Sequence, residues 1–166
     1  MNLRIRPFRD DDMDDLVELS LLAWTPVFAS FKQILGPDVY PILYPDWRKL
    51  QADLVEKACR DGDETPVWVA EVDGVVAGFV AYKLRNRDEG GEGEVYLIAV
   101  HPEYQNRGIG TELNLFALDK MREGGMKLAV VATGGDPSHA PARRSYEKAG
   151  YTAMPLVRYY QALTEQ

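Results

Sequence analysis

Apolar and polar positions alternate along the chain with two different periods, and these periods predict its strands and helices. A period of two marks residues 3–6, 67–72, 75–82 and 94–100 as strands. The second and third of these flank Asp73-Gly74, a dipeptide typical of tight hairpins. Residues 126–132 form an apolar run that predicts a buried strand. Two shorter strands are expected within residues 152–163, on either side of Pro155.

A period close to 3.6 predicts the helices. They are residues 13–20, a proline-interrupted and aromatic-rich segment 26–60 whose regular final part is about 46–59, residues 108–122 and residues 141–149. A run of aspartates precedes the first helix, and Asp11 or Asp12 is expected to cap it. Gly124-Gly125 and Gly150 end the last two helices.

The order of these elements predicts a mixed α/β fold, in which helices flank a mostly antiparallel sheet. Strands 94–100 and 126–132 are joined through helix 108–122, so this pair is expected to be parallel. The chain has 166 residues and no repeat or linker. Residues 1–166 are therefore expected to form a single domain.

Composition and charge narrow the class of protein. Hydrophobic residues make up 46% and charged residues 27% of the chain, as in soluble globular proteins. No apolar run approaches the roughly 20 residues of a membrane span, and the N-terminus lacks a signal-peptide pattern. We therefore expect a cytoplasmic protein without a membrane partner. The net charge of −7 argues against a nucleic-acid partner, because phosphate binding requires a basic face.

The chain carries one cysteine, Cys59, and two histidines, His101 and His139. A single cysteine cannot form an internal disulfide, and these residues lack the spacing of a metal-binding cluster. No metal site is expected.

The turn Gln105-Asn106-Arg107-Gly108-Ile109-Gly110 lies between a predicted strand and a predicted helix. Two glycines in a first helical turn cost about 0.5–1 kcal/mol each against alanine, whereas they allow an anion to approach the free N–H groups of the helix. Gly110 is followed by Thr111-Glu112, so the P-loop pattern fails. The dinucleotide fingerprint fails as well, because Leu113 occupies the place of its third glycine. A tight strand-to-helix turn is the alternative explanation of the glycines, and a site for ATP or NAD is a further one.

Two segments together resemble the GNAT superfamily of N-acetyltransferases. Residues 97–110 are similar to its acyl-CoA-binding motif, and residues 142–151, which contain Tyr146-Glu147-Lys148-Ala149-Gly150-Tyr151, are similar to the helix that carries its general acid. The element order agrees from residue 3 to about 162. The resemblance implies a splayed parallel strand pair in the sheet. It also implies direct transfer of an acetyl group from acetyl-CoA to a primary amine in a ternary complex.

The resemblance also implies which residues bind acetyl-CoA. The backbone of Ile98, Ala99 and Val100 would pair with the pantetheine arm. The pyrophosphate would be surrounded by Gln105, Asn106, Arg107, Gly108, Ile109, Gly110 and Thr111. The cofactor would also contact His139, just before the last helix, and Ala142 within it. Arg107 either reaches a phosphate or lies in solvent. His139 stands where many relatives have an asparagine, and it either contacts the cofactor or only begins the helix.

Two residues are the catalytic candidates. Tyr146 matches the general acid of the family. Glu94 begins the splayed strand, where some relatives place a general base, although a solvated strand-end carboxylate is the alternative.

Trp24 and Phe28 precede the hairpin, where relatives build the acceptor pocket. They either contact the acceptor, a small-molecule or peptide amine, or pack on the sheet. A homodimer is compatible with the resemblance. The alternative function is a non-catalytic acyl-CoA-binding regulatory module of the same fold.

Overall fold

The computed structural model describes residues 1–85 and 90–163. Its centre is a five-stranded sheet in the order β1 (Leu3–Pro7), β2 (Val67–Val72), β3 (Val75–Arg85), β4 (Glu92–Val100) and β5 (Leu128–Val130). All neighbouring strands are antiparallel except β4 and β5, which are parallel. The predicted mixed α/β class and its mostly antiparallel sheet are confirmed.

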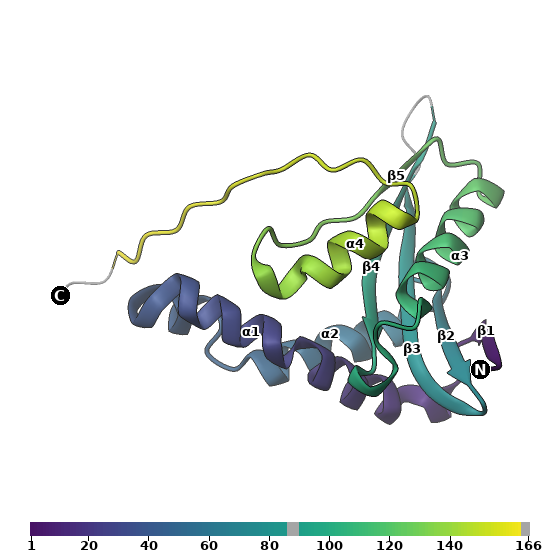
Figure 1. Cartoon of the computed structure of the whole chain (residues 1–166), viewed down its shortest axis with the longest axis horizontal. Coiled ribbons are helices and arrows are strands. Elements are labelled where there is room, and N and C mark those ends of the chain that lie inside the picture. The colour runs from purple at the N-terminus through teal and green to yellow at the C-terminus, as the bar shows by residue number, and fades with distance from the viewer. Residues whose placement is uncertain (86–89, 164–166) are drawn as a thin grey trace.

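Four helices and four short 3₁₀ turns complete the described structure (Figure 1). The helices are α1 (Met13–Leu43), α2 (Trp47–Arg60), α3 (Ile109–Glu123) and α4 (Ala140–Lys148), and the turns are η1 (Asp10–Asp12), η2 (Gly62–Glu64), η3 (Pro102–Tyr104) and η4 (Pro137–His139). The first predicted helix and the first part of the proline-rich segment after it lie in α1, and the regular final part of that segment is α2. The backbone of α1 is not helical at Gly36, where φ is 73° and ψ is −178°, so two helical segments meet there at a kink just before Pro37.

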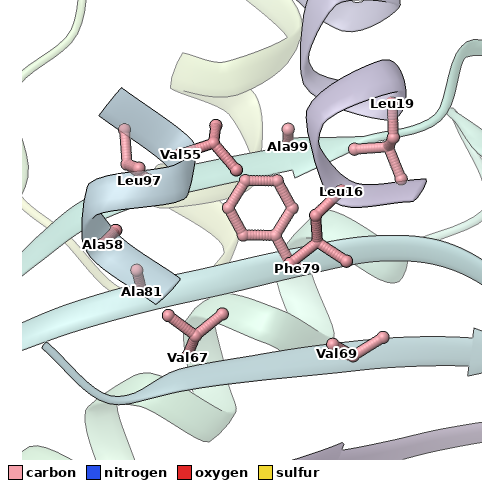
Figure 2. Close-up of a cluster of buried hydrophobic side chains, with 10 residues drawn as sticks. All are labelled: Leu16, Leu19, Val55, Ala58, Val67, Val69, Phe79, Ala81, Leu97 and Ala99. Atoms are coloured by element: carbon pink, nitrogen blue, oxygen red, sulfur yellow. The ribbon is translucent and has the colours of Figure 1, made fainter. Parts of the chain in front are cut away.

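Each face of the sheet has its own apolar core. On one face α1 and α2 pack over the central strands, with the ring of Phe79 among Leu16, Leu19 and Val55 (Figure 2). On the other face α3 presents Leu113 and three further buried apolar residues at helical spacing. Full burial of one such side chain stabilises the fold by about 1.5–3 kcal/mol. The two cores therefore fix the sheet between the helix layers.

A buried ion pair ties β1 to the start of α1. Arg6 donates to both carboxylate oxygens of Asp12, at 2.8 and 2.9 Å, and to Glu71 of β2 at 2.8 Å. These hydrogen bonds with Arg6 hold the pKa of Asp12 below its usual value. The predicted N-cap position is confirmed for Asp12, but its side chain accepts no hydrogen bond from the N–H groups of α1 itself. Its carboxylate binds Arg6 and accepts instead from the Arg9 N–H at 2.8 Å, which caps the preceding turn η1.

The parallel strand pair is splayed, as the resemblance implied. β5 pairs with β4 at three positions only, from Glu92 with Leu128 to Glu94 with Val130. The remainder of β4, residues 95–100, has no strand neighbour on this side within the described chain. A register shift between Ala81 and Tyr82 also inserts an extra residue, Tyr96, into β4.

Two predictions about the end of the sheet are wrong. Residues 152–163 form no strand. The predicted buried strand 126–132 is only three residues long in the structure, and its Leu128 and Val130 are 57% and 38% exposed. Within the described residues, no strand lies against the outer edge of β5, and its side chains are therefore left exposed there.

Candidate active site

The turn before α3 presents a row of free backbone donors. In the described chain, the N–H groups of residues 106–111 have no hydrogen-bond acceptor, and the first helical bond runs from the Glu112 N–H to the Gly108 oxygen at 3.0 Å. Unpaired N–H groups at a helix start, together with the positive end of the helix dipole, bind anions. This arrangement can hold a phosphate group.

The two glycines of the turn have different structural reasons. Gly108 is the N-cap residue with φ of 84°, a left-handed conformation that favours glycine. Gly110 faces α4, and a Cβ atom there would lie 3.3 Å from the Oγ of Ser145. A tight turn therefore explains why glycine occurs at these two positions. It does not explain why six successive N–H groups in the described chain have no acceptor.

The open edge of β4 adds further backbone groups to the same side. The His101 N–H donates to the Ala77 oxygen of β3 at 2.8 Å. Since the backbone groups of successive strand residues point to opposite sides, this bond determines which residues of β4 face β3. The backbone groups of Ala99 therefore point to β3, and those of Ile98 and Val100 point to the splayed side. Gln105 donates its side-chain amide to the Val100 oxygen at 3.0 Å, so this side chain supports the turn.

Tyr146 lies on α4 and is 8% exposed. Burial, and then the neighbouring Tyr151, raises its pKa to about 12. The two rings meet edge to face at 5.9 Å. No described residue hydrogen-bonds the Tyr146 hydroxyl. Tyr146 is thus a protonated phenol with a free donor at neutral pH.

Ala142 lies one helical turn before Tyr146 and is half-buried. Residues four apart share one face of a helix, so Ala142 accompanies Tyr146 on that face.

Glu94, the predicted base, is engaged by a cation. Arg85 of β3 donates to its carboxylate at 2.6 Å, and the Glu94 side chain is 29% exposed. This ion pair occupies the carboxylate that a general base would use.

His139 is part of a hydrogen-bonded network that the sequence did not reveal. Its Nδ1 lies 2.6 Å from the Oδ1 of Asp136, and the other carboxylate oxygen accepts from Ser30 at 2.6 Å and from Ser138. Burial opposes the charge on Asp136, but these hydrogen bonds outweigh it and hold the pKa of Asp136 well below its usual range. The charged Asp136 favours a proton on Nδ1 and leaves the lone pair on Nε2.

The His139 imidazole is held between aromatic rings. Phe31 stacks on it with centroids 5.6 Å apart, and Trp24 contacts it edge to face at 6.0 Å. The side chain is buried, yet Nε2 has no partner among the described residues and is not sealed from solvent. His139 therefore offers one fixed acceptor atom between α1 and α4.

The two predicted acceptor residues differ in position. Phe28 is 4% exposed and lies at the centre of an aromatic cluster on α1 and α2, stacked on Trp47 at 4.5 Å. Trp24 is half-buried and lies between Phe28 and His139. The packing alternative thus accounts for Phe28, whereas Trp24 borders the His139 network.

Arg107, the cationic candidate in the turn, is exposed, and its guanidinium lies 5.3 Å from the centre of the Tyr104 ring. Arg143 on α4 donates instead to the backbone oxygens of Gly134 and Asp136, at 2.6 and 2.8 Å. Arg143 therefore holds the loop that carries Asp136 against α4.

Within the described residues, no group of three or more His, Cys, Asp or Glu side chains is placed to hold a metal ion. In the same part of the chain, no helix combines the length and apolarity of a membrane span.

Comparison with known proteins identifies relatives. A model of the acetyltransferase (GNAT) family matches residues 28–151. A mycothiol acetyltransferase from Thermomonospora curvata is 33% identical over 100 residues, which cover 60% of this chain and 32% of that protein. The chain thus spans about a third of the length of this relative.

Two solved structures share the fold. A GNAT-family protein from Desulfovibrio desulfuricans superposes with a TM-score of 0.71 at 23% identity, over 98% of this chain and 93% of the other. AAC(6')-Iy in complex with the bisubstrate analogue CoA-S-monomethyl-acetylneamine superposes with a TM-score of 0.61 at 18% identity. The superposition covers 97% of this chain and 98% of the other. At these identities the likeness concerns the fold.

Proposed function

Because the chain belongs to the acetyltransferase (GNAT) family, we propose that it transfers an acetyl group from acetyl-CoA to a primary amine by direct attack. The observation that carries this proposal is the row of free N–H groups at residues 106–111, beside the open edge of β4. A pyrophosphate needs the first feature and an amide-bearing arm needs the second.

The residues present fit this donor. Its pyrophosphate would bind the N–H groups of residues 106–111. Its arm would pair with the open backbone groups of Ile98 and with the N–H of Val100, whose oxygen already accepts from Gln105. The backbone groups of Ala99 point to β3 and would not hydrogen-bond the arm. Ala99 would only hold its neighbours Ile98 and Val100 in the extended strand. The AAC(6')-Iy structure, whose ligand contains CoA, supports this use of the fold.

In the proposed reaction, the amine nitrogen attacks the thioester carbonyl, the carbon–sulfur bond breaks, and the amine proton passes to a base. Tyr146 stabilises the departing thiolate. Its pKa of about 12 lies about 3.5 units above that of an ordinary thiol, so complete transfer of its proton would cost about 5 kcal/mol. Tyr146 therefore acts as a hydrogen-bond donor whose proton moves only as the thiolate forms.

His139 is the favoured base. Its Nδ1 is bound to Asp136, which orients the imidazole, and its Nε2 has no partner among the described residues and can accept the amine proton. Glu94 is the second candidate, and its carboxylate is already engaged by Arg85.

Substitution at the two positions separates these candidates. His139→Asn is expected to lower kcat about 100-fold or more, because the amide cannot accept the proton. Glu94→Gln is expected to lower it less than tenfold. Steady-state kinetics with the best amine at saturating acetyl-CoA measures both. Since asparagine can still hydrogen-bond a cofactor, the Kd for acetyl-CoA should not change in His139→Asn. A larger loss of kcat in Glu94→Gln would assign the base to Glu94.

The left-handed conformation of Gly108 provides a test of the phosphate site. Gly108→Ala is expected to raise the Kd of CoA about tenfold, because relief of the strain at φ 84° moves the N–H groups of the turn. Gly125→Ala is the matched control, since Gly125 has φ of 78° and equally open surroundings at the other end of α3. Calorimetric titration should show weaker binding only in Gly108→Ala. Equal affinities in the two variants would remove the turn from the binding site.

The reaction itself is tested with purified protein, acetyl-CoA and a panel of amines. The panel contains aminoglycosides, amino sugars, amino acids and peptides with free N-termini. Release of free thiol that depends on one amine, with a product heavier by one acetyl group, is the expected result. Tight CoA binding without turnover on any amine would favour the non-catalytic module. A rise in melting temperature with ATP or NAD rather than CoA would favour a nucleotide site.

A further inference from the structure

Asn114 is the one polar side chain on the buried face of α3 in the described chain. It is 0% exposed, and the other buried residues of this helix are apolar. Its Oδ1 atom is buried without a hydrogen-bond partner among the described residues. Asparagine is a weaker helix former than leucine, and an unpaired buried oxygen destabilises a fold. The stability of α3 therefore does not explain why an asparagine occurs here.

The amide group of Asn114 connects two parts of the candidate site. Its Nδ2 donates to the Gly110 oxygen at 2.9 Å and to the Ser145 Oγ at 3.0 Å. Gly110 belongs to the turn with the free N–H groups, and Ser145 precedes Tyr146 on α4. Within the described chain, the Asn114–Ser145 bond is the one side-chain hydrogen bond between α3 and α4. We call it the Asn114–Ser145 tie.

The two ends of α4 are held by different elements. The N-terminal end follows Asp136, whose carboxylate accepts from Ser30 of α1 at 2.6 Å. Ser145 lies toward the other end, so close to α3 that a Cβ atom at Gly110 would be 3.3 Å from its Oγ. The part of α4 that carries Tyr146 therefore depends on α3 for its position.

We propose that Asn114 is a positioning residue for acetyl transfer, whose amide holds the Tyr146 hydroxyl at a fixed place relative to the turn at residues 106–111. The inference rests on the proposed function, in which this turn binds the pyrophosphate and Tyr146 meets the sulfur of the same donor. A displacement of about 1 Å at a reacting group can lower turnover by about 100-fold. Asn114 is buried and acts through Gly110 and Ser145, not by contact with the donor.

Ser145→Ala tests the tie, because it removes the hydroxyl that accepts from Asn114 and keeps the bond to Gly110. Steady-state kinetics should show a kcat about tenfold lower, and calorimetric titration a Kd for acetyl-CoA within about twofold of wild type, since the turn keeps its N–H groups. In a Tyr146→Phe background, Ser145→Ala should not lower kcat further, because the tie acts through the Tyr146 hydroxyl. An unchanged kcat in Ser145→Ala, or an equal loss in both backgrounds, would overturn the proposal.

Asn114→Leu removes the tie from its other side, with a side chain of the same branched skeleton. It should lower kcat as much as Ser145→Ala, and the double variant should show no additional loss. Its melting temperature should equal or exceed that of wild type, because the unpaired Oδ1 is removed. An Asn114→Leu variant that is less stable but keeps the wild-type kcat would make Asn114 a purely structural residue and refute the positioning role.

The matched control is a second buried amide–hydroxyl pair between two helices. Gln51 of α2 donates its side-chain amide to the Oγ of Ser20 on α1 at 2.8 Å, in the core on the other face of the sheet. Ser20→Ala should lower the melting temperature, because it leaves the buried amide of Gln51 without this acceptor. It should leave kcat unchanged, since it does not alter the position of α4.

Hydrogen exchange provides a readout that does not depend on turnover. Saturating CoA should slow exchange of the α4 amides 144–148 at least about fivefold more in wild type and in Ser20→Ala than in Ser145→Ala, because the tie carries the effect of the occupied turn to α4. Equal slowing in Ser145→Ala, or no slowing in wild type, would contradict the tie. This comparison can be made even if no amine is acetylated, so failure of the tie and failure of the proposed function are distinguishable.

Discussion

Replacing Tyr146 by phenylalanine is expected to lower kcat by about 100-fold or more, with little change in the Kd for acetyl-CoA. The hydroxyl has no hydrogen-bond partner in the described chain, so its loss breaks no structural bond. Its proposed partner is the sulfur of the leaving group, whose negative charge develops only in the transition state. The effect therefore falls on turnover and not on binding.

Tyr151→Phe is the control for this experiment. Tyr151 packs against Tyr146 at 5.9 Å, and burial raises its pKa to about 12 as well. Its hydroxyl is buried without a hydrogen-bond partner. Removing that hydroxyl should leave kcat unchanged and should not destabilise the fold. Equal kcat values for Tyr146→Phe and wild type would end the assignment of Tyr146 as the acid.

Removal of the Asp12 carboxylate should have the largest effect on stability. Asp12→Ala leaves the Arg6 guanidinium buried with Glu71 as its remaining carboxylate, and is expected to lower the free energy of unfolding by about 3 kcal/mol. Urea titration at pH 7 measures the difference. Asp53→Ala removes an exposed ion pair with Lys49 and should cost less than about 0.5 kcal/mol.

The contribution of Asp12 to the free energy of unfolding should be lost at low pH. Because the pKa of Asp12 is lowered in the folded protein, its stabilisation is complete above the ordinary value of about 3.9 and is lost as the pH falls through the lowered value. The difference in stability between wild type and Asp12→Ala should therefore be constant from pH 7 to 5 and shrink below about pH 4. A difference that stays constant down to pH 3 would show that the carboxylate charge does not stabilise the fold.

Most of the fold could be predicted because its signals are local. Asp73-Gly74 joins β2 and β3 as expected, and Gly124 and Gly150 follow the ends of their helices. The bulge at Tyr96 has no local signal, since it depends on how two strands pair. The strand-like pattern of residues 152–163 does not form strands, because a local pattern does not say which edge a strand would pair with.

The part of the candidate site that is made of backbone N–H groups could be predicted from the sequence. A glycine pattern between a strand and a helix indicates free N–H groups, and the structure has them at residues 106–111. The network around His139 was missed, because Ser30 lies 106 positions away from Asp136 in the sequence. Asp136 itself could have been noted, since an aspartate three residues before a histidine in a short turn is placed to bond it. The Arg85–Glu94 pair depends on strand register and had no such signal.

Titration of the ¹⁵N-labelled protein with acetyl-CoA, followed by amide NMR, tests the proposed binding site most directly. The backbone amides of residues 106–111 should show the largest shifts, together with Ile98 and Val100 on the open side of β4. Ala99, whose amide points to β3, should shift less. Binding of acetyl-CoA that leaves the amides of residues 106–111 unchanged, or no binding at millimolar acetyl-CoA, would contradict the proposed site.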